Sequence, residues 1–112
     1  MILIVDDHPQ VRAMIRSIIE DLDENICECA DGADALDAFQ KHHPDWVLMD
    51  IAMPRMNGLE AARQIIAAFP DAKIAIVTNY DDADSRQAAR KAGAQAYFTK
   101  ENLISLRFLL AR

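Results

Sequence analysis

The chain has 112 residues, of which 52% are hydrophobic, enough for one domain with a packed core and too many for a disordered protein. Its formal net charge of -6 argues against general binding to nucleic acids by this chain alone. No apolar run is long enough to span a membrane, and the charges at Asp6 and Asp7 argue against an N-terminal signal peptide, so we expect a cytoplasmic protein.

Short apolar runs recur along the chain and predict strands that are buried on both faces of a sheet. Four of these runs are followed or ended by polar residues: Ile2–Val5, Trp46–Met49, Ile74–Val77 and Ala96–Thr99. A fifth short strand is predicted at Ile26–Ala30, before the turn Asp31-Gly32. Its thiols, Cys27 and Cys29, are too few for a structural zinc site, and we interpret them as small apolar residues of a strand.

Segments with apolar residues at helical spacing separate the strands. The inward face of the first helix is predicted to carry Val11, Met14, Ile15, Ile18, Ile19 and Leu22. The later helices are predicted at 33–42, over Leu59–Phe69, from the capping pair Asp81-Asp82 to Gly93, and over a final segment with Leu103, Leu106 and Leu110. Alternating strands and helices predict one α/β domain over residues 1–112, a doubly wound parallel sheet with helices on both faces.

Polar side chains stand where the predicted strands end, namely Asp6, Asp7, Asp50, Thr78 and Lys100. Because the carboxyl ends of parallel strands share one edge of the sheet, these side chains should converge there. Carboxylates so close together repel one another unless a cation joins them. The pattern therefore predicts a divalent-metal site that accepts a phosphoryl group. Oxygen ligands favour a hard cation, and Mg²⁺ together with Lys100 would neutralise the three carboxylates.

The motifs Asp6-Asp7-His8, Val47–Gly58, Thr78, Ala92-Gly93-Ala94 and Lys100 are similar to those of the receiver domain of two-component response regulators. The resemblance covers essentially the whole chain and implies a flavodoxin-like sheet of five parallel strands in the order 2-1-3-4-5. It implies a signalling switch with weak self-phosphorylation and self-dephosphorylation chemistry, not an enzyme with a separate substrate.

The resemblance also implies a role for each site residue. Asp50 is the phosphoacceptor and a metal ligand. Asp7 binds the metal directly, Asp6 binds it through water, and the backbone carbonyl of Ala52 is a further ligand. Thr78 contacts the phosphoryl group and Lys100 pairs with it. Tyr97 is the aromatic switch that responds to Thr78.

The implied partners are a sensor histidine kinase or a phosphotransfer protein, and a downstream output domain or effector protein. Whether the chain stands alone or belongs to a longer transcription factor is left open, as is a homodimer on activation. Two other classes compete. An aspartate-nucleophile phosphatase places an Asp-x-Asp pattern after its first strand, whereas Asp6 and Asp7 are adjacent. A flavin-binding carrier needs a first loop rich in Ser, Thr and Gly, which is missing here.

Three local expectations complete the sequence prediction. His8 is interpreted as a loop residue before Pro9. Most receivers have proline after the lysine, but Glu101 follows Lys100, so a trans peptide bond is expected there. Tyr80 follows Thr78 by two positions and is expected to shield the phosphoryl group from water.

Overall fold

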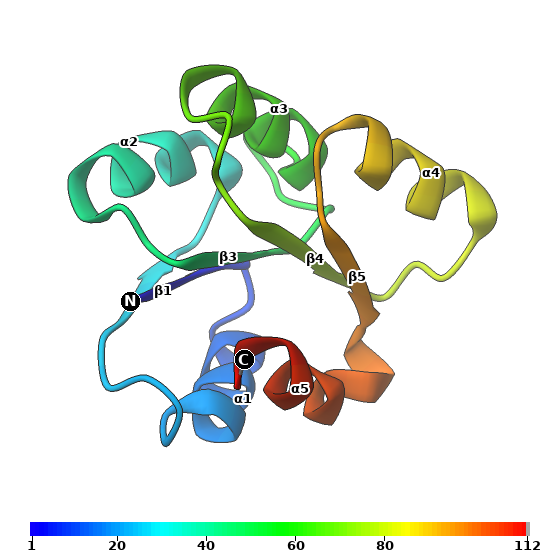
Figure 1. Cartoon of the computed structure of the whole chain (residues 1–112). Coiled ribbons are helices and arrows are strands. Elements are labelled where there is room, and N and C mark those ends of the chain that lie inside the picture. The colour runs from blue at the N-terminus through cyan, green and yellow to red at the C-terminus, as the bar shows by residue number, and fades with distance from the viewer. Residues whose placement is uncertain (112) are drawn as a thin grey trace.

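The computed structural model describes residues 1–111 and has five parallel strands between two layers of helices (Figure 1). In chain order the elements are β1 (Ile2–Val5), α1 (Pro9–Ile19), β2 (Ile26–Cys29), α2 (Gly32–His42), β3 (Trp46–Met49), α3 (Gly58–Ala68), β4 (Ile74–Thr78), α4 (Ala83–Lys91), β5 (Ala96–Thr99), the 3₁₀ helix η1 (Lys100–Ser105) and α5 (Leu106–Leu110).

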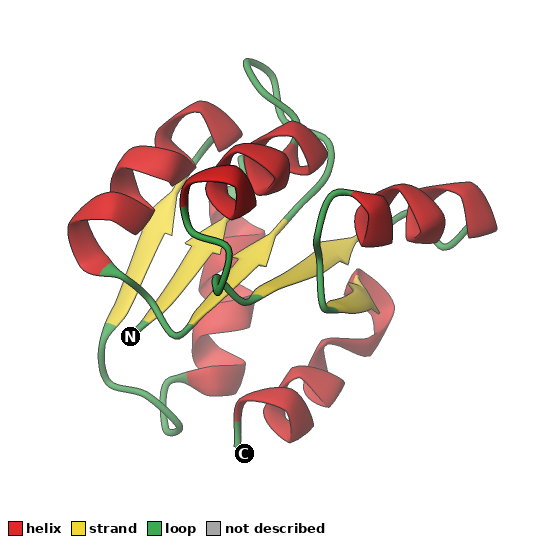
Figure 2. Cartoon of the chain, turned by 45° about the horizontal axis from the view of Figure 1, so that its top comes forward, coloured by secondary structure: helices red, strands yellow, loops and turns green. Residues whose placement is uncertain are grey.

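The strand order is β2-β1-β3-β4-β5, and every neighbouring pair is parallel, which confirms the predicted topology. The strands point in one direction, so their carboxyl ends form a common edge (Figure 2). Helices α2, α3 and α4 cover one face of the sheet, whereas α1 and α5 cover the other (Figure 1).

Alternating side chains of each strand divide the core into two clusters, one on each face of the sheet. In β1, Leu3 and Val5 pack under α2 and α3, whereas Ile2 and Ile4 pack against α1 and α5. Since β1, β3 and β4 are covered on both faces, their residues are almost all buried, which explains why they read as continuous apolar runs.

The ends of α4 confirm the predicted capping residues. The Asp82 side chain accepts hydrogen bonds from the Ser85 amide at 2.9 Å and from the Ser85 hydroxyl at 2.8 Å. Gly93 has φ +103°, a backbone conformation that favours glycine after a helix.

The first helix is shorter than its apolar pattern predicts. It ends at Ile19, so Leu22 lies in the following turn, and the inward placement of Met14 is wrong because 51% of that residue is exposed. The face of α1 toward the sheet buries Ile15 and Ile19 fully, and Val11 and Ile18 pack partly buried beside them.

The final segment is not one α-helix as predicted. It begins as η1 and continues as the five-residue helix α5. The buried residues Leu103 and Leu106 are three positions apart, a spacing that a 3₁₀ helix with three residues per turn places on one face. The Lys100–Glu101 bond is trans, as expected, and no cis bond occurs among residues 1–111.

Candidate functional site

The predicted site residues meet at the carboxyl edge of the sheet. Asp6 follows β1 and Asp50 follows β3, and the Asp50 amide donates a 2.9 Å hydrogen bond to the Val5 carbonyl, which joins the two strand ends. Both carboxylate residues are buried, with 1% of Asp6 and 4% of Asp50 exposed, and Thr78 at the end of β4 is equally inaccessible. The structure therefore brings polar groups together inside the fold, where their interactions are screened only weakly.

Lys100 reaches this cluster from the end of β5. Its Nζ lies 2.9 Å from Asp6 Oδ2 and 3.4 Å from Asp50 Oδ2. Burial opposes the charge of the ammonium group, but the two carboxylates outweigh that effect and raise the pKa of Lys100. One cation thus stabilises two carboxylates.

Asp50 is nevertheless held in an unfavourable electrostatic environment. Burial and then the nearby Asp6 carboxylate raise its pKa above the ordinary value of 3.8, and Lys100 and the Ile51 amide offset only part of that shift. The Ile51 amide donates a 2.9 Å hydrogen bond to Asp50 Oδ1. A buried carboxylate that favours neutralisation is suited to binding a cation or to forming a covalent bond through oxygen.

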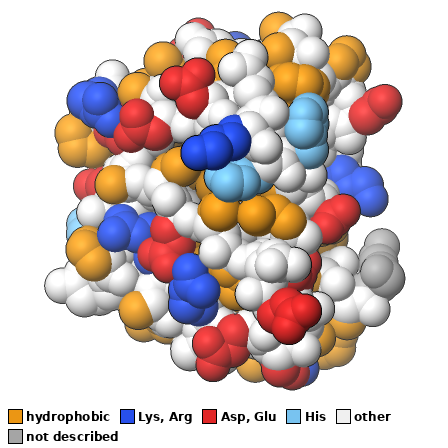
Figure 3. All heavy atoms as spheres, turned by 90° about the vertical axis from the view of Figure 1, so that its left-hand side faces the viewer, with side chains coloured by type: hydrophobic (Ala, Val, Ile, Leu, Met, Phe, Trp, Pro, Cys, Tyr) orange, Lys and Arg blue, Asp and Glu red, His pale blue; other side chains and the backbone are white. Residues whose placement is uncertain are grey.

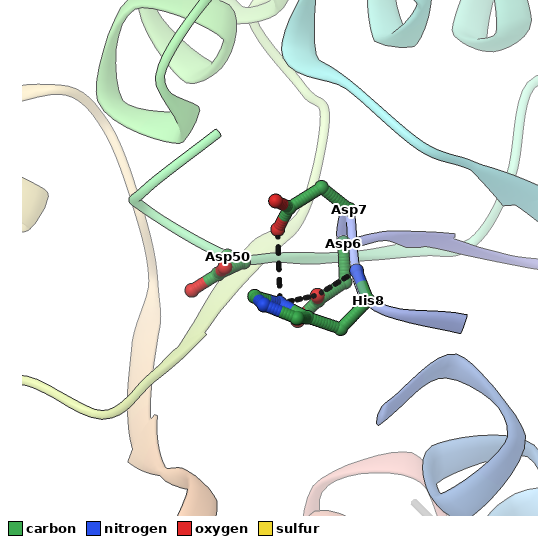
Figure 4. Close-up of side chains that lie close together, drawn as sticks. All are labelled: Asp6, Asp7, His8 and Asp50. Carbon is green, nitrogen blue, oxygen red and sulfur yellow. Dashed lines mark hydrogen bonds and ion pairs between the residues drawn. The ribbon is translucent and has the colours of Figure 1, made fainter. Parts of the chain in front are cut away.

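His8 belongs to the same cluster, which the sequence interpretation missed. Its ring Nδ1 lies 3.1 Å from Asp7 Oδ1 and 3.3 Å from Asp6 Oδ1 (Figure 4). The His8 amide also donates a 2.8 Å hydrogen bond to Asp6 Oδ1, which fixes the turn after β1. Adjacency to the acidic pair was the available signal, but sequence position alone does not give the direction of a side chain.

The acidic cluster fits a divalent cation. One ligand atom from each of Asp6, Asp7, His8 and Asp50 lies within 4.8 Å of the others (Figure 4). Asp6 Oδ2 and Asp7 Oδ1 are buried, and their close polar neighbours among the described residues are Lys100 Nζ, 2.9 Å from the first, and His8 Nδ1, 3.1 Å from the second. Oxygen atoms in such surroundings are the ligands that Mg²⁺ prefers.

An open pocket gives access to the cluster from solvent. It is lined by His8, Asp50, Ala52, Thr78, Asn79, Tyr80 and Lys100. Ala52 and Tyr80 therefore line the same pocket as Asp50.

Tyr97 lies next to the pocket but outside the carboxylate cluster. Its hydroxyl donates a 2.6 Å hydrogen bond to the Tyr80 carbonyl, and the Arg86 guanidinium lies 4.6 Å from the centre of its ring. Arg86 in turn donates to Asp81. These contacts connect the loop after Thr78 with α4 and β5.

A third buried carboxylate, Asp31, was not predicted to have any part in the site. It lies in the turn before α2 and accepts hydrogen bonds from the backbone amides of Arg55 and Met56, in the loop that follows Asp50. In the sequence, Asp31-Gly32 has the appearance of an ordinary turn, and no local pattern shows that it contacts residues more than twenty positions away.

In the part of the chain that the structure describes, none of the helices is both long enough and apolar enough to cross a membrane.

Residues 2–107 match the family model of the response regulator receiver domain. The transcriptional regulatory protein DegU of Brevibacillus brevis is 37% identical over 102 residues, covering 89% of this chain and 43% of that protein. The uncharacterized transcriptional regulatory protein YhcZ of Bacillus subtilis is 40% identical over 102 residues, covering 89% of this chain and 48% of that protein. The chain thus spans about half the length of these curated relatives.

Solved structures with the same fold include a two-component response regulator of the LuxR family from Aurantimonas, with a TM-score of 0.85, 33% identity, and coverage of 98% of this chain and 84% of that one. Chemotaxis protein CheY4 of Vibrio cholerae has a TM-score of 0.89 and 27% identity, covering 97% of this chain and 93% of that one. The CheX–CheY complex of Borrelia burgdorferi with BeF₃ and Mg²⁺ has a TM-score of 0.88 at 21% identity, covering 99% and 89%, a likeness of fold alone.

Proposed function

The chain belongs to the response regulator receiver domain family, and on that premise we propose that residues 1–112 form a phosphorylation-activated signalling switch whose phosphoacceptor is Asp50. The observation that carries the proposal is the buried contact between Asp50 and Lys100, beside Asp6. A lone structural carboxylate would not need an open pocket, an ammonium group and two further acids around it.

In the proposed reaction, an Asp50 carboxylate oxygen attacks the phosphorus of a phosphohistidine on a sensor histidine kinase or phosphotransfer protein. The oxygen–phosphorus bond forms as the nitrogen–phosphorus bond breaks, and the imidazole leaves. Lys100 pairs with one oxygen of the incoming phosphoryl group, while the Thr78 hydroxyl contacts another. These groups position charge rather than perform covalent chemistry, as phosphoryl transfer requires.

We propose Mg²⁺ as the cation of this site. Asp6, Asp7, Asp50 and the backbone carbonyl of Ala52 would hold it, and the close approach of one ligand atom from each of Asp6, Asp7 and Asp50 inside a buried cluster supports that assignment. When bound, Mg²⁺ supplies neutralisation of the charge on the carboxylates and on the phosphoryl oxygens. The ion and Lys100 together balance the charges of the three acids.

The proposed switch starts at Thr78 and ends at Tyr97. A phosphoryl group on Asp50 would draw the Thr78 hydroxyl toward it, and the loop 79–80 would move with it. The Tyr97 hydroxyl is bonded to the Tyr80 carbonyl, so movement of this loop changes the position of the ring. The surface of α4, β5 and α5 then differs between the two states, and an output domain or effector protein reads that difference. The same surface is also where two copies of the chain would associate if activation produces a homodimer.

Acetyl phosphate, a small phosphoryl donor, tests the assignment of Asp50. The intact mass of the wild-type chain should rise by about 80 Da, one phosphoryl group, and a chelator should prevent the rise. Asp50→Asn should remove the adduct. Asp34→Asn, which changes an exposed acid that pairs with Arg55, serves as the matched control and should be labelled normally.

Labelling that persists in Asp50→Asn would show that another residue accepts the phosphoryl group. Labelling that is insensitive to the chelator would contradict the metal role of Asp6 and Asp7.

A further inference from the structure

The turn before α2 is attached to the loop that follows the proposed phosphoacceptor. Asp31 is 4% exposed and accepts three backbone hydrogen bonds, from Ala33 at 2.9 Å, from Arg55 at 2.9 Å and from Met56 at 3.0 Å. The first of these caps α2. The other two reach residues 24 and 25 positions further along the chain, in the loop 50–57.

The two backbones are in direct contact at this point. A Cβ atom added to Gly32 would lie 2.5 Å from the Met56 carbonyl oxygen, closer than real atoms approach, so glycine is required for the approach. The loop is constrained again at its far end, where a Cβ on Gly58 would lie 1.8 Å from the Asp50 carbonyl oxygen. The segment between Asp50 and Gly58 is therefore fixed on both sides.

Asp31 acts on this loop as an ionised group. Burial by itself raises the pKa of Asp31, but the amides of Ala33, Arg55 and Met56, with a smaller contribution from the Arg55 charge, outweigh burial and lower it. Its Oδ1 accepts hydrogen bonds from the Ala33 and Met56 amides, and its Oδ2 accepts one from the Arg55 amide. The Arg55 side chain adds a longer ion pair, with its Nε 4.0 Å from Asp31 Oδ1, while its guanidinium also donates to the exposed Asp34 at 2.6 Å.

We propose that Asp31 is a positioning residue for the cation site. It holds the loop so that the carbonyl of Ala52, three residues before Arg55, stays in the pocket that also contains Asp50. The inference rests on the proposed function, because the cation site is part of that proposal. It adds a residue from a different strand–helix turn to the machinery of the site. Without Asp31, the amides of Arg55 and Met56 lose their acceptor and the loop gains alternative conformations.

The test compares Mg²⁺ affinity by calorimetry in the wild-type chain and two variants. Asp31→Asn keeps Oδ1 and the cap of α2 but cannot accept from the Arg55 amide, and Asp31→Ala removes all three bonds. We expect Mg²⁺ binding to weaken about tenfold in Asp31→Ala, the usual effect of losing a residue that orients metal ligands, and by less in Asp31→Asn. Hydrogen exchange at the Arg55 and Met56 amides should accelerate in the same order.

Asp82→Ala is the matched control for general loss of a helix cap. Asp82 caps α4 as Asp31 caps α2, but it makes no contact with the loop 50–57 among the described hydrogen bonds. It should lower the melting temperature and leave Mg²⁺ affinity within about twofold of wild type. Labelling by acetyl phosphate at saturating Mg²⁺ should recover in Asp31→Asn, because the defect is in binding.

Faster exchange at Arg55 and Met56 with unchanged Mg²⁺ affinity would overturn the inference, since the loop would then be held for stability alone. Equal loss of Mg²⁺ affinity in Asp82→Ala would overturn it as well. If Asp31→Ala does not fold, Asp31→Asn decides the question by the same two measurements. A wild-type chain that binds Mg²⁺ but is not labelled would refute the proposed function and leave this comparison intact.

Discussion

Asp50 combines two properties that oppose each other, burial and negative charge. Lys100 contacts it at 3.4 Å but is closer to Asp6, at 2.9 Å. The remaining strain appears as the raised pKa of Asp50. Asp50, the residue with the clearest chemical role, therefore lowers the stability of the fold, as is common at functional sites.

This cost predicts how stability depends on pH. Because the folded-state pKa of Asp50 is raised above 3.8, its protonated form favours folding at acid pH, and that contribution is lost as pH rises through the folded pKa. Asp50→Asn should therefore be more stable than wild type at pH 7, by about 0.5–2 kcal/mol, with the difference vanishing below the ordinary value of 3.8. Urea unfolding at pH 7 and pH 3.5, without Mg²⁺, measures it; an Asn variant less stable at pH 7 would contradict the argument.

Tyr80 should set the lifetime of the phosphorylated state. Half of the residue is exposed, yet it lines the pocket with Asp50, and its carbonyl is held by the Tyr97 hydroxyl. Its ring can cover the phosphoryl group and exclude water, while Ala52 offers no group to orient an attacking water. We expect Tyr80→Ala and Ala52→Asn to lose phosphate several-fold faster than wild type, measured by intact mass over time after donor removal. A Tyr80→Ala decay as slow as wild type would place the control of lifetime elsewhere.

At the scale of elements, the close approach of α3 to β3 depends on one small residue. Gly58 begins α3 and its amide donates to the Ile51 carbonyl at 2.8 Å. Gly58→Ala would place a methyl carbon 1.8 Å from the Asp50 carbonyl oxygen, so the loop or the helix must shift. We expect a loss of about 2–3 kcal/mol in unfolding free energy and strongly reduced phosphate labelling. Ala67→Ser, at an exposed position of the same helix, should change neither; a Gly58→Ala variant with wild-type stability would show that this approach is relaxed in solution.

The strands were predictable because buried parallel strands leave continuous apolar runs, and because polar residues such as Asp50 and Thr78 follow these runs directly. Their order was implied by the resemblance to receiver domains. The caps of α4 were predictable because Asp82 and Gly93 are residue types that favour the two ends of a helix. Met14 was misplaced because helical spacing defines a wide stripe and the sheet covers only part of it. The winding of η1 depends on tertiary packing of Leu103 and Leu106, and the contact of Asp31 with Arg55 spans the whole of α2 and β3, so neither has a local signature.

At the scale of the whole molecule, charge is dispersed rather than concentrated. Acidic and basic side chains are interspersed on the face shown in Figure 3. The basic residues of α4 are accompanied by acids, and Arg86 is paired with Asp81. A net charge of -6 disfavours an approach of this chain to the phosphate groups of nucleic acids.

We therefore expect no sequence-specific DNA binding by these 112 residues, at about 0.15 M salt, before or after phosphorylation. Electrophoretic shift of a promoter fragment, with competitor DNA as the control for non-specific contacts, measures this. Specific shifts that survive the competitor would contradict the expectation and point to a basic surface formed on activation.

The ion pairs of Lys100 also have a consequence for how the chain folds as it is synthesised. Asp6 and Asp50 are brought together when β1 pairs with β3, whereas their counter-ion comes after the last strand of the sheet. A nascent chain that has formed only β1, β2 and β3 therefore holds two carboxylates close together without the Lys100 ammonium group. Docking of β5 relieves that repulsion, so the last strand to leave the ribosome makes the earlier pairing electrostatically favourable.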